Sequence, residues 1–178
     1  MINKAFLFAL KAHENQFRKN GNPYICHPFY VSMILAKNGA SDNLIVAGLL
    51  HDTVEDTSTS YEDLRSEFND EIADIVAFDS EDKRLPWEQR KQMIIDALRD
   101  TKNKNYQMLI CADKLSNITD IEEDLKKEGE NVWSHFHRSK EYQEKFYRDL
   151  VEVLKPINDL EMYKEFKERV ERVFKDGN

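Results

Sequence analysis

The most constraining feature of this sequence is an apolar run, residues 44–50, that ends in a cluster of ionisable side chains. An apolar run without alternation is typical of a helix that is buried on most sides, or less often of a buried strand. His51 and Asp52 follow the run directly, and Glu55 and Asp56 come about one helical turn later. On one continuous helix these four side chains fan across a single arc, with i, i+4 neighbours paired.

Charged side chains beside a core helix are costly unless something compensates them. Imidazole nitrogens and carboxylate oxygens together ligate zinc, manganese or iron, so a bound divalent cation is the simplest compensator. For any His-Asp pair the alternative is a polar helix end that reaches solvent. The second acidic pair and the apolar residues before the cluster favour the metal.

Two further residues of the ligand type interrupt apolar segments. His27 precedes Pro28, which suits the first turn of a helix, so His27 is expected near the N-cap. A lone histidine in this position is more often structural or exposed. Asp113 interrupts an apolar helix, where an unpaired carboxylate is strongly disfavoured, although backbone donors or an arginine can also satisfy it. Asn117 is expected on the same helix face, while Cys111 points away as a packed thiol.

Helical periodicity extends over the rest of the chain and no segment alternates with period two, so the sequence predicts an all-α fold. The central helix is expected to start near residue 41 and to reach Asp56. The segment 18–23 is expected to be a loop, 79–86 a solvated charged connection, and 122–130 a solvated face or turn. The other predicted helices span residues 3–17, 28–38, 61–68, 71–78, 87–99, 106–118, 132–154 and about 159–175.

Length and charge limit the function classes. The 178 residues are expected to form a single domain over 1–178, with enough apolar residues, 40%, for a core. The formal net charge of −8 argues against general binding to nucleic acids or anionic membranes. Cys26 and Cys111 lack metal or disulfide spacing and are expected to be reduced thiols, and no leader or transmembrane span is apparent. The sequence therefore predicts a cytoplasmic protein.

Taken together, the motifs resemble a known family, the HD-domain metal-dependent phosphohydrolases. The closer resemblance is to the hydrolase domain of the RelA/SpoT alarmone enzymes and to the stand-alone small alarmone hydrolases. Three segments carry it over roughly residues 3–155: Arg18 with residues 21–28 (GNPYICHP), residues 49–57 (LLHDTVEDT) and residues 112–117 (ADKLSN). The synthetase and regulatory regions of the long enzymes do not fit in this chain, so the resemblance implies hydrolysis alone.

The resemblance implies a single-domain HD-type helical bundle with one divalent metal, in this family usually manganese. The metal ligands would be His27, His51, Asp52 and Asp113. Such a metal lowers the pKa of its bound water, and Glu55 and Asp56 would orient or deprotonate that water. The implied reaction removes the 3′-diphosphate of guanosine 3′,5′-bis(diphosphate), a small nucleotide substrate.

A basic rim must neutralise the phosphates of such a substrate. By resemblance Arg18 and Lys19 flank the substrate, Lys114 and Asn117 contact it, and the Tyr24 region holds the base. A basic cluster further along the chain adds Arg138 and Lys140 as candidates.

Two segments depart from the alarmone-specific pattern. Residues 79–83 read DSEDK, where the alarmone-specific enzymes often have a sequence similar to VTDDK. Residues 133–147 resemble a bacterial subgroup of HD hydrolases without a settled substrate. Two alternatives therefore stay open: a phosphatase for another nucleotide, including a nicotinamide dinucleotide phosphate, and a non-catalytic nucleotide-binding module. The Glu55-Asp56 pair counts against the module, because a pure binder has no use for water-activating acids. The oligomeric state is not predicted.

Overall fold

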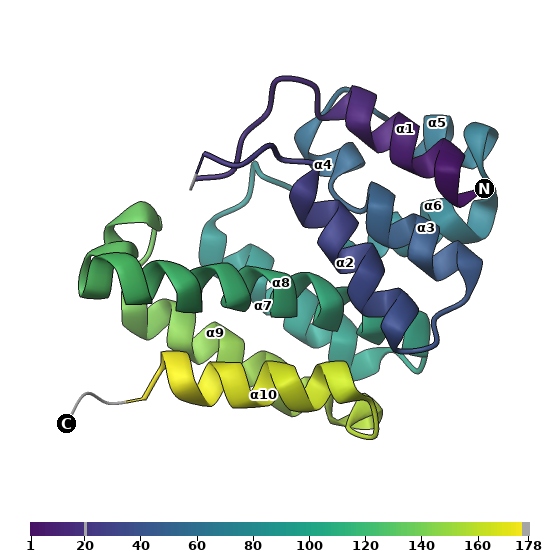
Figure 1. Ribbon diagram of the computed structural model, residues 1–178. Helices are drawn as coiled ribbons and strands as arrows, with labels where there is room; N and C mark the ends of the chain where they lie inside the picture. Colours follow the sequence, from purple (N-terminus) through teal and green to yellow (C-terminus); the bar gives the residue numbers. More distant parts are fainter. Residues whose placement is uncertain (20, 176–178) are drawn as a thin grey trace.

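The computed structural model describes residues 1–19 and 21–175, and it is all-α, as predicted (Figure 1). Among these residues no β-strand forms, and a single antiparallel bridge joins Phe17 to Pro23. Asn20 in the predicted loop and residues 176–178 of the predicted domain lie outside the described residues. The single-domain assignment over 1–178 stays a prediction.

The helices follow one another with short connections. In chain order the elements are α1 (Ile2–Ala12), α2 (Cys26–Lys37), α3 (Asp42–Leu50), α4 (Thr53–Asp56), α5 (Tyr61–Glu67), α6 (Asp70–Asp79), α7 (Trp87–Asp100), α8 (Lys104–Glu128), the 3₁₀ helix η1 (Gly129–His135), α9 (Lys140–Val153), the 3₁₀ helix η2 (Lys155–Ile157) and α10 (Glu161–Val173).

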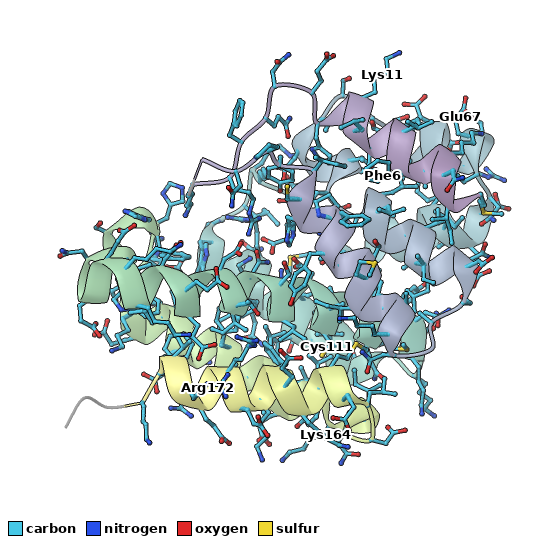
Figure 2. The ribbon with its side chains drawn as sticks, in the orientation of Figure 1. Phe6, Lys11, Glu67, Cys111, Lys164 and Arg172 are labelled. Carbon is cyan, nitrogen blue, oxygen red and sulfur yellow. The ribbon has the colours of Figure 1, made fainter. Side chains whose placement is uncertain are left out.

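Helix α8 is the central element (Figure 1). It packs against α10 along one side and against α2, α3 and α6 on the other. Residues 107–113 are all buried, because other helices cover α8 on both sides. Most residues of this stretch are apolar, as a helix covered on both sides requires. Cys111 is fully buried between α8 and α10, as Figure 2 shows, which confirms the prediction of a packed thiol.

Local capping signals set several helix starts. The Ser41 side chain accepts a hydrogen bond from the Leu44 amide and begins α3, as the sequence predicts. Ser60 and Asp63 form a capping box at α5. These side chains satisfy amide groups that the first turn of a helix leaves unpaired.

Three predicted helices have different boundaries in the structure. Helix α1 ends at Ala12 rather than at residue 17, because Asn15 adopts a left-handed backbone conformation (φ 62°), and Phe17 beyond it is exposed. Helix α8 continues to Glu128, so most of residues 122–130, predicted as a solvated face or turn, are helical. Gly129, with φ 62°, ends this helix. The predicted helix 132–154 is instead the separate elements η1 and α9.

The segment 79–86 is not a simple solvated connection, contrary to the prediction. Asp79 is the last residue of α6 and is partly buried. Glu81 has a side chain only 12% exposed, because it forms ion pairs with Arg90 and Lys91 of α7. This connection therefore forms part of the wall of the site described next.

Candidate metal centre

The central predicted helix is broken at the residues that matter most. Helix α3 ends at Leu50, a turn holds His51 and Asp52, and α4 begins at Thr53, so the prediction of one continuous helix is wrong. The Thr53 hydroxyl donates to the Leu50 carbonyl oxygen at 2.6 Å, which supplies this carbonyl with a side-chain partner at the break. The break places His51 and Asp52 together at the end of a buried helix.

A glycine brings the two histidine-bearing helices together. A Cβ atom at Gly48 of α3 would lie 2.6 Å from Leu35 Cδ1 and 3.4 Å from the Ser32 backbone, both on α2. The close approach that glycine permits sets His27 of α2 opposite His51. Their Nε2 atoms lie 3.2 Å apart.

Four side chains converge on one buried point from α2, the α3–α4 turn and α8. His27 Nε2 lies 3.1 Å from Asp113 Oδ1, and His51 Nε2 lies 3.2 Å from Asp52 Oδ2. The two cross distances, His27 Nε2 to Asp52 Oδ2 and His51 Nε2 to Asp113 Oδ1, are 3.6 and 3.7 Å. The structure thus brings together the four residues that the sequence predicts as ligands.

The chemistry of these groups fits a divalent cation. His51 Nδ1 donates to the Gly48 carbonyl oxygen at 2.9 Å, so a neutral His51 presents a lone pair at Nε2. His27 Nδ1 lies 2.9 Å from Ser116 Oγ, which can accept an Nδ1 proton in the same way. Two imidazole lone pairs then face two carboxylate oxygens, which also accept hydrogen bonds from the Tyr24 hydroxyl and the Asn117 amide. Imidazoles fixed through Nδ1 are typical of metal ligands.

The protonation equilibria of the cluster show how strongly it attracts positive charge. Burial lowers the pKa of His51, but the Asp52 and Asp113 carboxylates raise it and prevail, so its pKa lies well above the usual value. At His27 burial prevails and the pKa is lowered. Burial opposes ionisation of Asp113, yet Lys114 and the two histidines hold its pKa well below the usual range.

Asp79 is a further acidic group at this point that the sequence reasoning missed. The carboxylates of Asp79 and Asp113 and the ring of His51 each offer one possible ligand atom, and these three atoms lie within 4.8 Å of one another. Burial, followed by the neighbouring charge of Asp113, raises the pKa of Asp79 to about 7. The available signal was the apolar periodicity of residues 72–78, which continues the helix to Asp79 instead of ending it in a solvated loop.

The predicted water-activating pair, Glu55 and Asp56, lies on α4 and lines the same pocket as His27, Asp52 and Asp113. The sequence shows no partner for either, but the structure does. Glu55 Oε2 accepts a hydrogen bond from the Glu81 amide at 3.1 Å, and Asp56 forms an ion pair with Lys83. Both acids are therefore held in place rather than free.

The Tyr24 hydroxyl links the two sets of carboxylates. It lies 2.8 Å from Asp52 Oδ2 and 2.8 Å from Asp56 Oδ2. Its ring stacks on His13 at 4.7 Å between centroids. Tyr24 thus contacts the predicted ligand set directly, in addition to lining the cleft in which a base is expected.

The pocket around the four converging residues, about 170 Å³, shares a wall with a larger cleft of about 440 Å³. The shared wall is mostly cationic, and its residues are Arg18, Tyr24, Arg90, Lys91, Lys114 and Asn117. Farther out the cleft is lined by aromatic side chains from α7, α9 and the segment after η1: Trp87, Phe136, Phe146 and Tyr147. A cationic inner part and an aromatic outer part suit an anion attached to a planar group.

The structure places the predicted substrate contacts in two groups. Arg18, Lys19, Lys114 and Asn117 line the cleft with Tyr24. Arg18 is fixed there by hydrogen bonds to Asn117 Oδ1 at 2.9 Å and Asp120 Oδ2 at 2.7 Å.

The other predicted contacts lie elsewhere. Arg138 forms an ion pair with Glu88, and Lys140 with Glu130 at 3.1 Å; neither basic residue lines the cleft. Arg90 and Lys91 of α7 take part in the wall instead, although the sequence reasoning treated that helix only as amphipathic. The signal that could have drawn attention to them is that Lys91 falls on the apolar face of this helix, four residues after Trp87 and three before Ile94, with Arg90 at the edge of that face.

Comparisons with known proteins agree with this geometry. A family model described as the HD domain matches residues 5–142. A protein of Xenopus tropicalis named guanosine-3′,5′-bis(diphosphate) 3′-pyrophosphohydrolase MESH1 is 36% identical over 146 residues, which are 80% of this chain and 78% of the relative. The crystal structure of lmo0812 from Listeria monocytogenes EGD-e superimposes with a TM-score of 0.78 at 38% identity, covering 88% of this chain and 98% of that one.

Some relatives are much longer than this chain. The guanosine-3′,5′-bis(diphosphate) 3′-pyrophosphohydrolase of Aquifex aeolicus is 45% identical over 75 residues, which are 42% of this chain and 11% of the relative. The match to such proteins is thus confined to a small part of their length. Within the described residues, no helix combines the length and apolar character needed to cross a bilayer.

Proposed function

This chain belongs to the HD-domain family, and on that premise we propose that it hydrolyses guanosine 3′,5′-bis(diphosphate) at the 3′ position and releases pyrophosphate. The observation that carries the proposal is the junction of two features: a buried set of metal-ligand atoms and a cationic, aromatic cleft that shares its wall. The name of the Xenopus relative, which matches most of both chains, supports the choice of substrate.

We assign the metal to His27, His51, Asp52 and Asp113, and manganese is the expected ion. When bound, a divalent metal supplies a nucleophile at neutral pH by lowering the pKa of a coordinated water. The four side chains are fixed for this task by their second contacts, among them His51 to Gly48 and Asp113 to Asn117. Replacing the mutual repulsion of two carboxylates by attraction to one cation would stabilise the cluster.

We assign proton transfer to the pair on α4. Burial raises the pKa of Glu55, which brings this carboxyl closer to the neutral range in which a general base works best. Asp56 is oriented by Tyr24 and Lys83 and faces the same pocket. This arrangement favours an enzyme over the non-catalytic nucleotide-binding module.

The cations of the shared wall would bind the phosphates. The whole chain carries a formal charge of −8, so a polyanion must rely on a local group of positive charges. Arg18, Lys91 and Lys114 have side chains only 14–19% exposed, where their charges are less screened than those of surface lysines. Charge stabilisation of this kind is often the largest single contribution in phosphoryl and acyl transfer.

The test is hydrolysis over a nucleotide panel with manganese, followed by mass spectrometry of the products. Release of pyrophosphate from the 3′ position of guanosine 3′,5′-bis(diphosphate) by the parent, but not by His51→Ala, would support the proposal. Loss of a single phosphate from another nucleotide, with the guanosine bis(diphosphate) intact, would replace it by the nucleotide phosphatase. Tight binding without turnover of any member would replace it by the binding module.

A further inference from the structure

Gln143 of α9 is a largely buried polar residue whose amide has no partner among the described residues. The residue is 6% exposed, yet its amide group makes no hydrogen bond with any of the described residues. Although the residue as a whole is largely buried, its amide oxygen and nitrogen are not fully enclosed by the protein, so they border the cleft and not the interior. Gln143 lines the outer part of the large cleft, and its amide is therefore available to a bound molecule.

The surroundings of Gln143 suit a planar ligand. Phe146 follows it on α9 by three residues, and Trp87 lies 6.1 Å from Phe146 between ring centroids, at 71° between the ring planes. Both rings line the cleft together with Phe136 and Tyr147. Nucleobases stack on the faces of such aromatic side chains, and hydrogen bonds to the base edge then distinguish one base from another.

Helix α8 provides a length scale from the metal centre to this outer part. Asp113, Asn117 and Asp124 lie on α8, and the last two line the cleft. At roughly 1.5 Å per residue, Asp113 and Asp124 are about 16 Å apart along the helix axis. A phosphate held at the metal end would leave room for an attached sugar and base to reach the outer part of the cleft.

We propose that Gln143 reads the edge of the nucleobase and selects guanine over adenine. The inference rests on the proposed function, because it takes the ligand to be a nucleotide whose phosphates lie at the metal end. It adds a specificity-determining residue that contacts the base rather than the reacting phosphate.

The amide of Gln143 offers one acceptor oxygen and two N–H donors. Guanine presents the O6 acceptor beside the N1–H donor, so one amide can pair with both. Adenine also presents one donor and one acceptor, and a rotated amide can match it. The difference comes from Asp124 in the same cleft, whose carboxylate only accepts: guanine has a second donor, the 2-amino group, and adenine has none.

The experiment measures nucleotide binding to the 178-residue chain with manganese, by calorimetry or by tryptophan fluorescence. Guanosine diphosphate, adenosine diphosphate and inorganic pyrophosphate are the probes. Gln143→Leu should weaken guanosine diphosphate binding by about fivefold or more, since a bidentate amide–base pair contributes at least about that much discrimination. It should also reduce the guanosine-over-adenosine preference to less than about threefold, while pyrophosphate binding stays the same.

Gln107→Leu is the matched control, because Gln107 is 2% exposed, also has an unpartnered amide oxygen and lies outside the cleft. This variant should leave all three affinities unchanged. Gln143→Leu should keep the thermal midpoint, because the amide that it removes makes no hydrogen bond with the described residues.

Three results would overturn the proposal: an unchanged guanosine preference in Gln143→Leu, an equal loss of pyrophosphate binding, or a large fall in the thermal midpoint, which would mean a structural role. A parent protein that binds guanosine diphosphate through Gln143 but leaves guanosine 3′,5′-bis(diphosphate) intact would uphold this inference and reject only the proposed function.

Discussion

At the inner end of the cleft each predicted ligand has a second contact that fixes it, whereas the outer end is lined mainly by aromatic side chains. His51 is held by the Gly48 carbonyl oxygen and Asp113 by the Asn117 amide. Outside, Arg138 is paired with Glu88 on the surface, and Gln143 has no partner among the described residues.

The difference follows from what each end must do. Charges buried at the inner end destabilise the fold unless their geometry is fixed and compensated, so a preformed ligand set needs a supporting shell of contacts. The outer end has to admit and release a planar group, and aromatic side chains do this with few fixed polar contacts. Substitutions at the inner end should therefore change chemistry, and those at the outer end should change selectivity.

The largest expected effect belongs to the inner end. His51→Ala should remove the metal and lower turnover by roughly 10³-fold or more, because metal-ion catalysis contributes several kcal/mol. Metal content measured by mass spectrometry, with circular dichroism to verify the helical fold, checks this. Retention of a full equivalent of manganese by both His51→Ala and Asp113→Ala would mean that the ligands lie elsewhere.

The next effect separates binding from chemistry at the same end. Glu55→Gln keeps an acceptor oxygen for the Glu81 amide but loses the base, so turnover should fall by about 10²-fold with metal and substrate affinity preserved. Since burial raises the pKa of Glu55, the parent should lose activity on acidification at a higher pH than an ordinary glutamate would give. That acidic limb should be absent from the pH profile of Glu55→Gln. An unaltered profile and rate would remove Glu55 from the mechanism.

The contrast between the two ends also explains which parts were predictable from the sequence. The helical class and most helix positions follow from apolar periodicity and capping residues, as with Ser41 at the start of α3. The break of the helix at His51 and Asp52 was not predictable in this way. Apolar periodicity indicates that a segment is helical, but it does not show where a side-chain hydroxyl, here that of Thr53, bonds to a backbone carbonyl oxygen at the end of the helix. The same limit applies to the end of α1, which is followed by Asn15. This residue has a left-handed backbone conformation although it is not a glycine.

The ligand-type residues at the inner end were found because each is an ionisable residue in an apolar segment, a pattern that one sequence can show. The outer wall combines α7, α9 and the segment after η1, which come together only in the folded chain. Lys91 and Gln143 are polar residues on the apolar faces of their helices, but only the folded chain shows that they line one cleft. Arg138 and Lys140 are the opposite case, because the basic cluster that predicts a binding rim forms ion pairs with Glu88 and Glu130 in the structure, and their role in binding stays a prediction.

A smaller effect is expected at Tyr24, where the two carboxylate sets meet. Tyr24→Phe removes a hydroxyl shared by Asp52 and Asp56 but keeps the ring that stacks on His13. Hydrogen bonds to charged groups contribute roughly 1.5–3 kcal/mol, so turnover should fall by about tenfold or somewhat more, with the Michaelis constant nearly constant. If the Michaelis constant rises instead while turnover is preserved, Tyr24 acts on the base, as the family resemblance alone implies.

The smallest expected effect tests where the outer end stops. Arg138→Ala removes an ion pair with Glu88 whose side chains are 38% and 47% exposed, and Lys140→Ala removes a similar pair with Glu130. Exposed ion pairs contribute between about 0 and 1 kcal/mol, and neither basic group lines the cleft, so both variants should change kcat/KM by less than about threefold. Lys167→Ala, which removes a remote pair on α10, is the reference for a purely surface change.

Steady-state kinetics at two salt concentrations make the comparison decisive, because a cation that attracts the substrate from the rim loses its effect as salt rises. A tenfold loss in Arg138→Ala that fades at high salt would extend the binding surface beyond the cleft, and would mean that the outer end recognises phosphate charge as well as the base.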